Sequence, residues 1–467
     1  MKKCILPLVL LVVLSIASCD PGGNVGETTK PNVVLIISDQ WSTRAADGSG
    51  NYKNGIQTPA IDRLAAEGIR FTQSYSTYPL CSPARASIFT GLYPHKNGIT
   101  RNVGFNKQTQ DMPDARAVAT LGGEFRKAGY ETAYFGKEHA AGYAWEGIDH
   151  LGTLTFSDGG MLAEGSAYDR VFTSDALKFI RGKHDKPFYM TLSLINPHDI
   201  CKVLGGKVKG ATFADAIHFC RDEEELYLRF QQRPELTSNH DSPYIKGMIL
   251  GKDFMFEELW GQDEDDWRRY VAAYYLLIEN TDWYIGLVIN ALREAGLEDN
   301  TIVVFTTDHG DMMGSHKLIA KTVFYEESVK TPMIIRYPDK IAPGSVDDHS
   351  LVGSIDIMPT LLDICGLDVP GNLDGRSFKN LCYSGNGDEF PVLFSVNRYG
   401  RMVRFDDFKF VRSEVYGEEY EILFDLNKDP DETTNVVNQP DYESASVRGR
   451  KLLEEWMQSE GIVLTYN

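Results

Sequence analysis

Two pairs of polar residues stand directly after two nearly continuous apolar runs. Asp39 and Gln40 follow the first run, and Asp308 and His309 follow the second. Such runs are typical of buried parallel strands, whose carboxyl ends meet at the sheet edge where α/β proteins place their sites. Three oxygen donors and one imidazole from two strand ends predict a divalent cation site. A single Asp at a strand end is often only a turn or cap residue; the paired arrangement favours a metal.

The donor types narrow the choice of ion. Carboxylate and amide oxygens favour Ca2+, a hard cation that takes oxygen ligands. An imidazole ligand is atypical for calcium, so Mg2+ or Mn2+ stays an alternative.

The charge balance limits the partners. The 467 residues include 47 Lys and Arg against 66 Asp and Glu, which gives a formal net charge of −19. This excess of acid excludes a general nucleic-acid binder. An acidic protein that binds an anion needs a local cluster of cations. The length exceeds that of a single core, so we expect one large domain and a smaller one.

The order of the elements predicts an α/β fold with a large, mostly parallel sheet flanked by helices. A third apolar run delivers His198 to the same edge as the two acidic pairs. Beyond residue 370 the pattern changes to a small antiparallel sheet with one packed helix. We therefore expect a catalytic domain at 31–370 and a C-terminal α+β subdomain at 371–467. The expected strands are 31–37, 186–195, 301–307, 392–396, 400–404, 408–412 and 421–425, and the expected helices are 60–67, 120–128, 174–181, 267–295 and 448–459.

The N-terminus has the features of an export signal. Lys2 and Lys3 precede an apolar run over 5–16, which is shorter than the roughly 20 residues of a membrane span. The small residues before Cys19 look like a bacterial lipobox, which implies a lipoprotein attached through Cys19 to a bacterial membrane. Ordinary secretion is the alternative. Residues 1–19 are thus expected to be the signal and lipobox, and the Gly-rich segment 20–30 a flexible tether.

Four of the seven cysteines lie outside the signal, the lipobox and the run around residue 81. Export permits disulfides, and closeness in sequence pairs Cys201 with Cys220 and Cys365 with Cys382. Four unpaired buried thiols are the alternative.

Cys81 begins the run Cys-Ser-Pro-Ala-Arg at 81–85, which resembles the sulfatase signature C-x-P-x-R. In that signature the cysteine is oxidised after translation to formylglycine. The pattern alone is weak, because a cysteine near a proline is usually a small buried hydrophobe. Further segments extend the resemblance over nearly all of the mature sequence, and the chain looks like a formylglycine-dependent sulfatase of the alkaline phosphatase superfamily. These segments are 31–40, 57–64, 129–139, 197–198, 308–311, 321 with 325–328, 354–363 and 423–430.

The resemblance implies a role for each cation near the motif. Arg85 would hold the formylglycine hydroxyl and the neighbouring metal ligands. Lys137 and His139 would bind the sulfate and the aldehyde hydrate. His198 and Lys321 would contact the sulfate and the bridging oxygen, so that His198 protonates the departing alcohol. Residue 81, as formylglycine, would join the four strand-end residues at the metal.

Three positions depart from the family pattern. Gln40 stands where many members carry Asp, which removes one negative charge from the metal site. Glu138 replaces the usual Trp, and Phe89 replaces a common Leu. None of these changes removes a group that the chemistry needs.

The sequence therefore predicts a sulfuric ester hydrolase that acts on a sulfated carbohydrate, of glycosaminoglycan or mucin type, after maturation by a formylglycine-generating enzyme. One hydroxyl of the hydrated aldehyde would attack sulfur, and Asp308 or His139 would help the other to expel sulfate. The alternatives are a phosphonate or phosphodiester hydrolase of the same superfamily and a non-catalytic glycan-binding lipoprotein. Candidate sugar contacts are Glu138, Asp199, Asn397 and Arg398.

Overall fold

The computed structural model describes most of the chain from residue 30 onward. Three parts of the chain for which predictions were made lie outside the described residues: the signal segment 1–19 with Cys19, the tether up to residue 29, and Cys220. Nothing in the structure tests those predictions. The described residues are 30–50, 52, 55–103, 117–152, 165–203, 231, 234–248, 264–385 and 390–462.

An eight-stranded sheet forms the centre of the molecule, with strand order β5-β4-β6-β1-β7-β8-β2-β9. Neighbouring strands run parallel except at the pairs β7–β8 and β8–β2. A separate parallel pair joins β3 (Ser74–Tyr75) to β10 (Val352–Gly353). The sheet strands are β1 (Asn32–Asp39), β2 (Ile69–Phe71), β4 (Glu131–Gly136), β5 (His150–Leu151), β6 (Phe188–Pro197), β7 (Thr301–Thr307), β8 (Met333–Arg336) and β9 (Ser345–Asp347).

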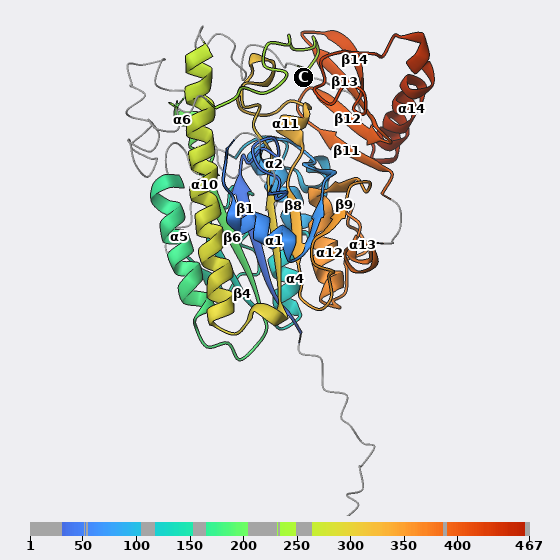
Figure 1. The fold of residues 1–467 in the computed structure, drawn as a ribbon. Coiled ribbons are helices and arrows are strands. Elements are labelled where there is room, and N and C mark those ends of the chain that lie inside the picture. The colour runs from blue at the N-terminus through green and yellow to red at the C-terminus, as the bar shows by residue number, and fades with distance from the viewer. Residues whose placement is uncertain are drawn as a thin grey trace, which may run out of the picture.

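Helices cover both faces of this sheet. In β1, Val34 and Ile36 pack into one apolar cluster, and Val33 and Leu35 pack into another. Alternate residues of a strand point to opposite faces, so the two clusters are the cores of two helical layers. Figure 1 shows α5 and α10 side by side over the first face. The helices of these layers are α1 (Pro59–Ala66), α5 (Gly165–Ile180) and α10 (Glu264–Glu294) on that face, and α2 (Cys81–Thr90), α4 (Leu121–Lys127), α12 (Ile357–Ile364) and α13 (Lys379–Ser384) on the other.

A four-stranded antiparallel sheet near the C-terminus packs on the large domain beside α11 (Figure 1). Met402 and Val411 of this sheet join a cluster with the loop after β7, while Val403 and Phe410 pack under α14. The α/β fold with its smaller C-terminal subdomain, predicted from the sequence, is thus confirmed. The remaining elements are β11 (Val392–Val396), β12 (Gly400–Phe405), β13 (Phe408–Val415), β14 (Glu418–Asp425), α3 (Pro94–Asn97), α6 (Ile200–Val203), α11 (Glu326–Val329), α14 (Glu443–Ser459) and the short 3-10 turns η2 (Glu298–Asn300), η3 (Ser315–Lys317), η4 (Ser354–Asp356) and η5 (Pro440–Tyr442).

A buried ionic group joins the small sheet to the large domain. Lys409 of β13 is fully buried, and its Nζ lies 2.6 Å from Glu326 Oε1 and 2.7 Å from Glu432 Oε1. The same Nζ donates a hydrogen bond of 2.8 Å to the carbonyl of Phe324. A buried ammonium group is stable only when it is paired in this way. Lys409 therefore fixes the segment that runs from β7 to α11.

The cysteines correct one prediction. Cys365, at the end of α12, and Cys382, in α13, are both free thiols buried in the same apolar cluster. A thiol packs as a small apolar side chain, so burial accommodates both without a bond between them. Burial raises the pKa of Cys365 to about 12. Cys201 is also a free thiol.

Across the ranges given above, no helix combines the length and the apolar character that crossing a bilayer requires.

Candidate active site

Two parallel strands and one helix deliver the central residues. Asp39 is the last residue of β1, Asp308 follows β7 directly, and Cys81 is the first residue of α2. Ligand atoms of Asp39, Cys81, Asp308 and His309 all lie within 4.8 Å of one another, and all four residues are buried. The Sγ of Cys81 is 3.2 Å from His309 Nε2 and 3.9 Å from Asp39 Oδ1. The structure thus brings together four of the five predicted metal ligands.

The ring of His309 is oriented by its own backbone neighbour. Its Nδ1 lies 2.9 Å from the carbonyl of Gly310, which makes Nδ1–H the donor and turns Nε2 toward Cys81. Metal-binding histidines are commonly held in this way by a carbonyl on the far side of the ring. Gly310 is required here, because a Cβ at this position would lie 2.0 Å from the carbonyl oxygen of Glu327.

Arg85 connects the two carboxylates. Its Nε donates to Asp308 Oδ2 at 2.8 Å and its Nη2 donates to Asp39 Oδ2 at 3.1 Å. The Nη1 group donates to Ser193 Oγ at 2.7 Å and to the carbonyl of Lys137 at 3.1 Å. Because Arg85 occupies the Oδ2 atoms, the Oδ1 atoms of Asp39 and Asp308 face the histidine, at 4.0 and 3.7 Å from His309 Nε2.

Cations surround the thiol of Cys81. Burial and Asp39 would raise the pKa of this thiol, but Lys137, Lys321 and His309 outweigh them and hold it well below its ordinary value. Lys137 Nζ is 2.5 Å from Asp39 Oδ2. The N-terminus of α2 adds a partial positive charge at residue 81. This is the local cationic cluster that an anion-binding site in an acidic protein requires.

The backbone at Gly136 places Lys137. Gly136 has φ +117°, and a Cβ there would lie 1.9 Å from the carbonyl oxygen of Ser193. The next amide, of Lys137, donates to that same carbonyl at 2.9 Å. The close approach of β4 to β6 thus depends on glycine at 136.

The side chain of Gln40 forms hydrogen bonds with Lys321 and Asp311, which are not members of the metal cluster. Its Oε1 accepts a hydrogen bond from Lys321 Nζ, and its Nε2 donates to Asp311 Oδ2 at 2.6 Å. Its backbone has φ +71° and is held by Asp308 Oδ1, which accepts from the amide at 3.2 Å, and by the hydroxyl of Tyr274, which donates to the carbonyl at 2.5 Å. In this arrangement Gln40 orients Lys321, and its role as a metal ligand stays a prediction.

Asp311 was not assigned a role from the sequence. Besides Gln40, its carboxylate accepts hydrogen bonds from the hydroxyl of Tyr270 at 2.9 Å and from the amide of Met313 at 2.7 Å. These partners come from α10 and from the loop after β7. The signal that could have pointed to it is its place at the end of the 308–311 segment, three residues after Asp308.

The two predicted histidines lie in different surroundings. His198 is placed beside Cys81, and burial together with Lys321 and Lys137 lowers its pKa. His139 contacts the carbonyl of Val103 through Nε2 at 3.0 Å, and its Nδ1 is buried with no hydrogen-bond partner among the described residues.

The side chains of two candidate sugar contacts, Glu138 and Asp199, turn to nearby backbone. Glu138 is 1% exposed, and its Oε1 accepts a hydrogen bond from the amide of Gly142 at 2.7 Å. Asp199 is also buried, and its Oδ1 accepts from the amide of Gly165 at 3.3 Å. Both carboxylates bind nearby backbone amides, and their role as sugar contacts stays a prediction. Asn397 and Arg398 instead line a cavity of about 380 Å³.

The donor set fits a divalent cation. Two carboxylate oxygens and an imidazole nitrogen converge in a fully buried position, and a divalent cation accepts this mixture of donors. Burial would raise the pKa of Asp39, but Lys137, His198 and Arg85 hold it well below its usual range. The carboxylate of Asp39 is therefore ionised and able to bind a cation.

The comparisons with known proteins agree with this geometry. The sulfatase family model matches residues 31–367, and a second model, described as the C-terminal part of N-sulphoglucosamine sulphohydrolase, matches residues 314–459. The first match covers well over half of the sequence, so the chain belongs to the sulfatase family. It is accordingly a sulfuric ester hydrolase, and the resemblance read from the Cys81 motif is confirmed.

Two curated relatives and one solved structure are similar over most of their length. An N-acetylglucosamine-6-O-sulfatase of Bacteroides thetaiotaomicron is 29% identical, over 96% of this chain and 90% of the relative. A Delta 4,5-hexuronate-2-O-sulfatase of the same organism is also 29% identical, over 95% and 92%. The solved structure of a 2-O GAG sulfatase aligns with a TM-score of 0.76 at 27% identity, over 92% of each chain.

Proposed function

We propose that this chain removes sulfate from a sulfated glycan, with residue 81 converted from cysteine to formylglycine. The convergence of Cys81, Asp39, Asp308 and His309 in one buried cluster carries the proposal. The two curated relatives support a carbohydrate substrate, since both are named for sulfated sugars. Maturation then requires a formylglycine-generating enzyme as a partner.

The chemistry divides between the modified residue and the fixed cations. The hydrated aldehyde supplies two hydroxyls, one to attack sulfur and one to expel the sulfate afterwards. Lys137 and Lys321 lie close enough to Cys81 to lower its pKa, which supports a role for both in stabilising negative charge on the sulfuryl oxygens, because buried cations do so without reorganisation. Arg85 keeps both carboxylates in position.

His198 is suited to protonate the leaving alcohol. It is placed beside Cys81 and close to Lys321 and Lys137, so a protonated imidazole there would deliver its proton to the oxygen that leaves with the alcohol. Lys321 provides the second positive group beside it.

Asp39, Asp308, His309 and the modified residue 81 would hold a divalent cation, for which we propose Ca2+. Such an ion would polarise the sulfate ester and orient the attacking hydroxyl. Gln40 is a proposed further oxygen ligand, a role that requires its Oε1 to leave Lys321.

The test compares matured protein with a Cys81→Ala variant on an aryl sulfate and on an aryl phosphodiester. Matured protein should hydrolyse the sulfate much faster than the diester, and both chelation and Cys81→Ala should abolish turnover. Mass spectrometry of the peptide containing residue 81 should find the aldehyde. Faster turnover of the diester would favour the phosphonate or phosphodiester hydrolase. Full activity of Cys81→Ala would overturn the mechanism, and an unmodified thiol in protein from the native host would favour a glycan-binding role.

A further inference from the structure

A cavity of about 380 Å³ lies between the segment after α3 and the turn that joins β11 to β12. Three arginines line it, Arg101, Arg398 and Arg401, and its described lining contains no Asp or Glu. In a chain with a net charge of −19, three cations without a carboxylate in one cavity are unusual. We call this space the arginine cavity.

Short contacts connect both walls of the arginine cavity to the active site. Asn397, in one wall, donates through Nδ2 to the carbonyl of Thr322 at 2.9 Å, and Thr322 follows Lys321 in sequence. Asn102, next to Arg101 in the other wall, accepts a hydrogen bond of 3.1 Å from the amide of Ser82. Ser82 follows Cys81. The cavity is thus the neighbour of the place where the sulfate ester would react.

The three arginines are available to different degrees. Arg101 and Arg398 are exposed, and no salt bridge joins either to a carboxylate among the described residues. The guanidinium of Arg398 lies 5.3 Å from the centre of the Tyr399 ring, an aromatic face that leaves its N–H edges uncovered. Arg401 is anchored through Nη1, which donates to the carbonyls of Asn397 and Gly400 at 2.8 and 2.7 Å.

A carboxylate that contacts this lining is already paired. His95 lines the cavity, and its Nε2 lies 3.1 Å from Glu460 Oε2, which also lies 2.6 Å from Lys96 Nζ. Glu460 therefore compensates Lys96 and His95, and the positive charge of the arginines remains.

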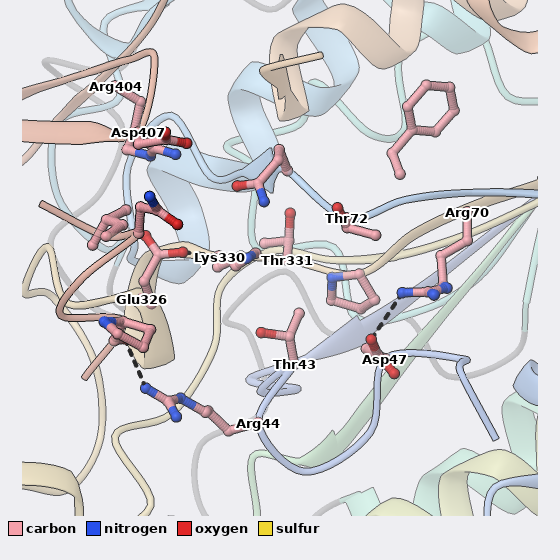
Figure 2. A pocket seen from close by; sticks show the side chains of 16 residues that line it. Thr43, Arg44, Asp47, Arg70, Thr72, Glu326, Lys330, Thr331, Arg404 and Asp407 are labelled. Carbon is pink, nitrogen blue, oxygen red and sulfur yellow. Dashed lines mark hydrogen bonds and ion pairs between the residues drawn. The ribbon is translucent and has the colours of Figure 1, made fainter. Parts of the chain in front are cut away.

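A second cavity provides a contrast. This space of about 500 Å³, shown in Figure 2, has both arginines and carboxylates in its lining. Its Arg70 points at Asp47, with 2.9 Å between Nη1 and Oδ2, and its Lys330 Nζ lies 3.3 Å from Glu326 Oε2. Internal pairs of this kind leave little net charge for a ligand. The arginine cavity has no such compensation in its described lining.

We propose that the arginine cavity binds a second anionic group of the substrate, a carboxylate or a second sulfate carried next to the sulfate ester that is cleaved. The substrate is then an anionic glycan rather than a neutral sugar with a single sulfate. The planar fork of an arginine donates two parallel hydrogen bonds to either group, which gives both attraction and orientation. This inference rests on the proposed sulfatase activity at residue 81.

The experiment measures kcat/KM of the matured protein on sulfated disaccharides in matched sets. One arm compares a uronic acid with its carboxyl-reduced alcohol, and the other compares a disulfated sugar with its monosulfated form. In at least one set, we expect the disaccharide with the additional carboxylate or sulfate to be preferred by about tenfold to a hundredfold in kcat/KM, mostly through KM. The arm that shows the preference identifies the group as carboxylate or sulfate.

Two variants assign the preference to the cavity. Arg398→Gln and Arg101→Gln should reduce it to a few-fold while leaving turnover of a small aryl sulfate close to that of the unaltered protein. Arg181→Gln is the matched control, because Arg181 is exposed, pairs with Glu294 and lies at the opposite end of the sheet. The control should keep the full preference.

Each contrary outcome has a distinct meaning. Equal kcat/KM on the two disaccharides of both matched sets would overturn the second anionic subsite. So would a variant that loses the same factor on both disaccharides of a set. Either result would leave the sulfatase activity intact. Turnover of the aryl sulfate without turnover of any anionic disaccharide would also overturn it. Failure on the aryl sulfate itself would refute the proposed function and the subsite together.

Discussion

The buried carboxyl of Glu138 should make the stability of this protein fall as the pH rises, and Glu138→Gln should remove that fall. Burial raises the pKa of Glu138 from 4.5 to about 7, although the amides of Ala140, Gly142 and Ala144 oppose the shift. The side chain stands between Lys137 and His139 but turns to the backbone, as its contact with Gly142 shows.

The sign follows from comparing the folded and unfolded chains. Below pH 4.5 the carboxyl is protonated in both states and contributes no pH dependence. Between pH 4.5 and 7 the unfolded chain loses the proton while the folded chain keeps it, so the free energy of unfolding decreases. The shift of 7 − 4.5 = 2.5 pH units corresponds to about 3 kcal/mol, which is fully lost above pH 7.

Urea unfolding of both proteins between pH 4.5 and 8.5 measures this difference. The amide side chain of the variant cannot ionise, so the difference in unfolding free energy between the two proteins should change by about 3 kcal/mol across that range. Glu455→Gln on the exposed surface of α14 is the control and should show almost no change. A difference that stays constant with pH would refute the reasoning, whatever its absolute size.

Two further predictions concern the C-terminal sheet and the N-terminus. Lys409→Met should destabilise the protein by about 3–5 kcal/mol in thermal or urea unfolding, because it leaves the buried Glu432 without its ammonium partner and takes one ion pair from Glu326, which keeps Lys330; a loss below about 1 kcal/mol would show that the group is not needed. We also propose that the chain is exported and lipid-anchored through Cys19, so protein made in a bacterial host should incorporate labelled fatty acid and Cys19→Ala should not; equal labelling of both would exclude that attachment.

Much of the fold could be predicted because its signals are local. The apolar runs that became β1 and β7 are long and end in polar residues, and the helix predicted over 267–295 is observed at Glu264–Glu294. The predicted helix over 174–181 was too short, since α5 begins at Gly165. Tyr168, Phe172, Ala176 and Ile180 lie four residues apart on one apolar face, so the helical pattern extends further toward the N-terminus than the prediction took it.

The sequence predicts which residues form the site, but it does not predict which way each side chain points. Asp39, Asp308 and Cys81 converge because strand ends and a helix start meet at one edge of the sheet. The orientation of Gln40 toward Lys321 and the inward turn of Glu138 depend on particular partners, Asp311 far away in sequence for the first and a local loop for the second. No spacing pattern encodes such choices.

The bond from Lys409 to the carbonyl of Phe324 has a consequence for how such enzymes can be recombined. Lys321 lies three residues before that carbonyl, so the ammonium group that would face the sulfuryl oxygens is tethered to the last quarter of the polypeptide. The second family match begins at 314, ahead of this segment, and not at the first strand of the small sheet. A chimera joined at 370 would take Lys409 from one parent and the segment around Phe324 from the other. A junction before 314 would take both from the same parent and so keep their contact.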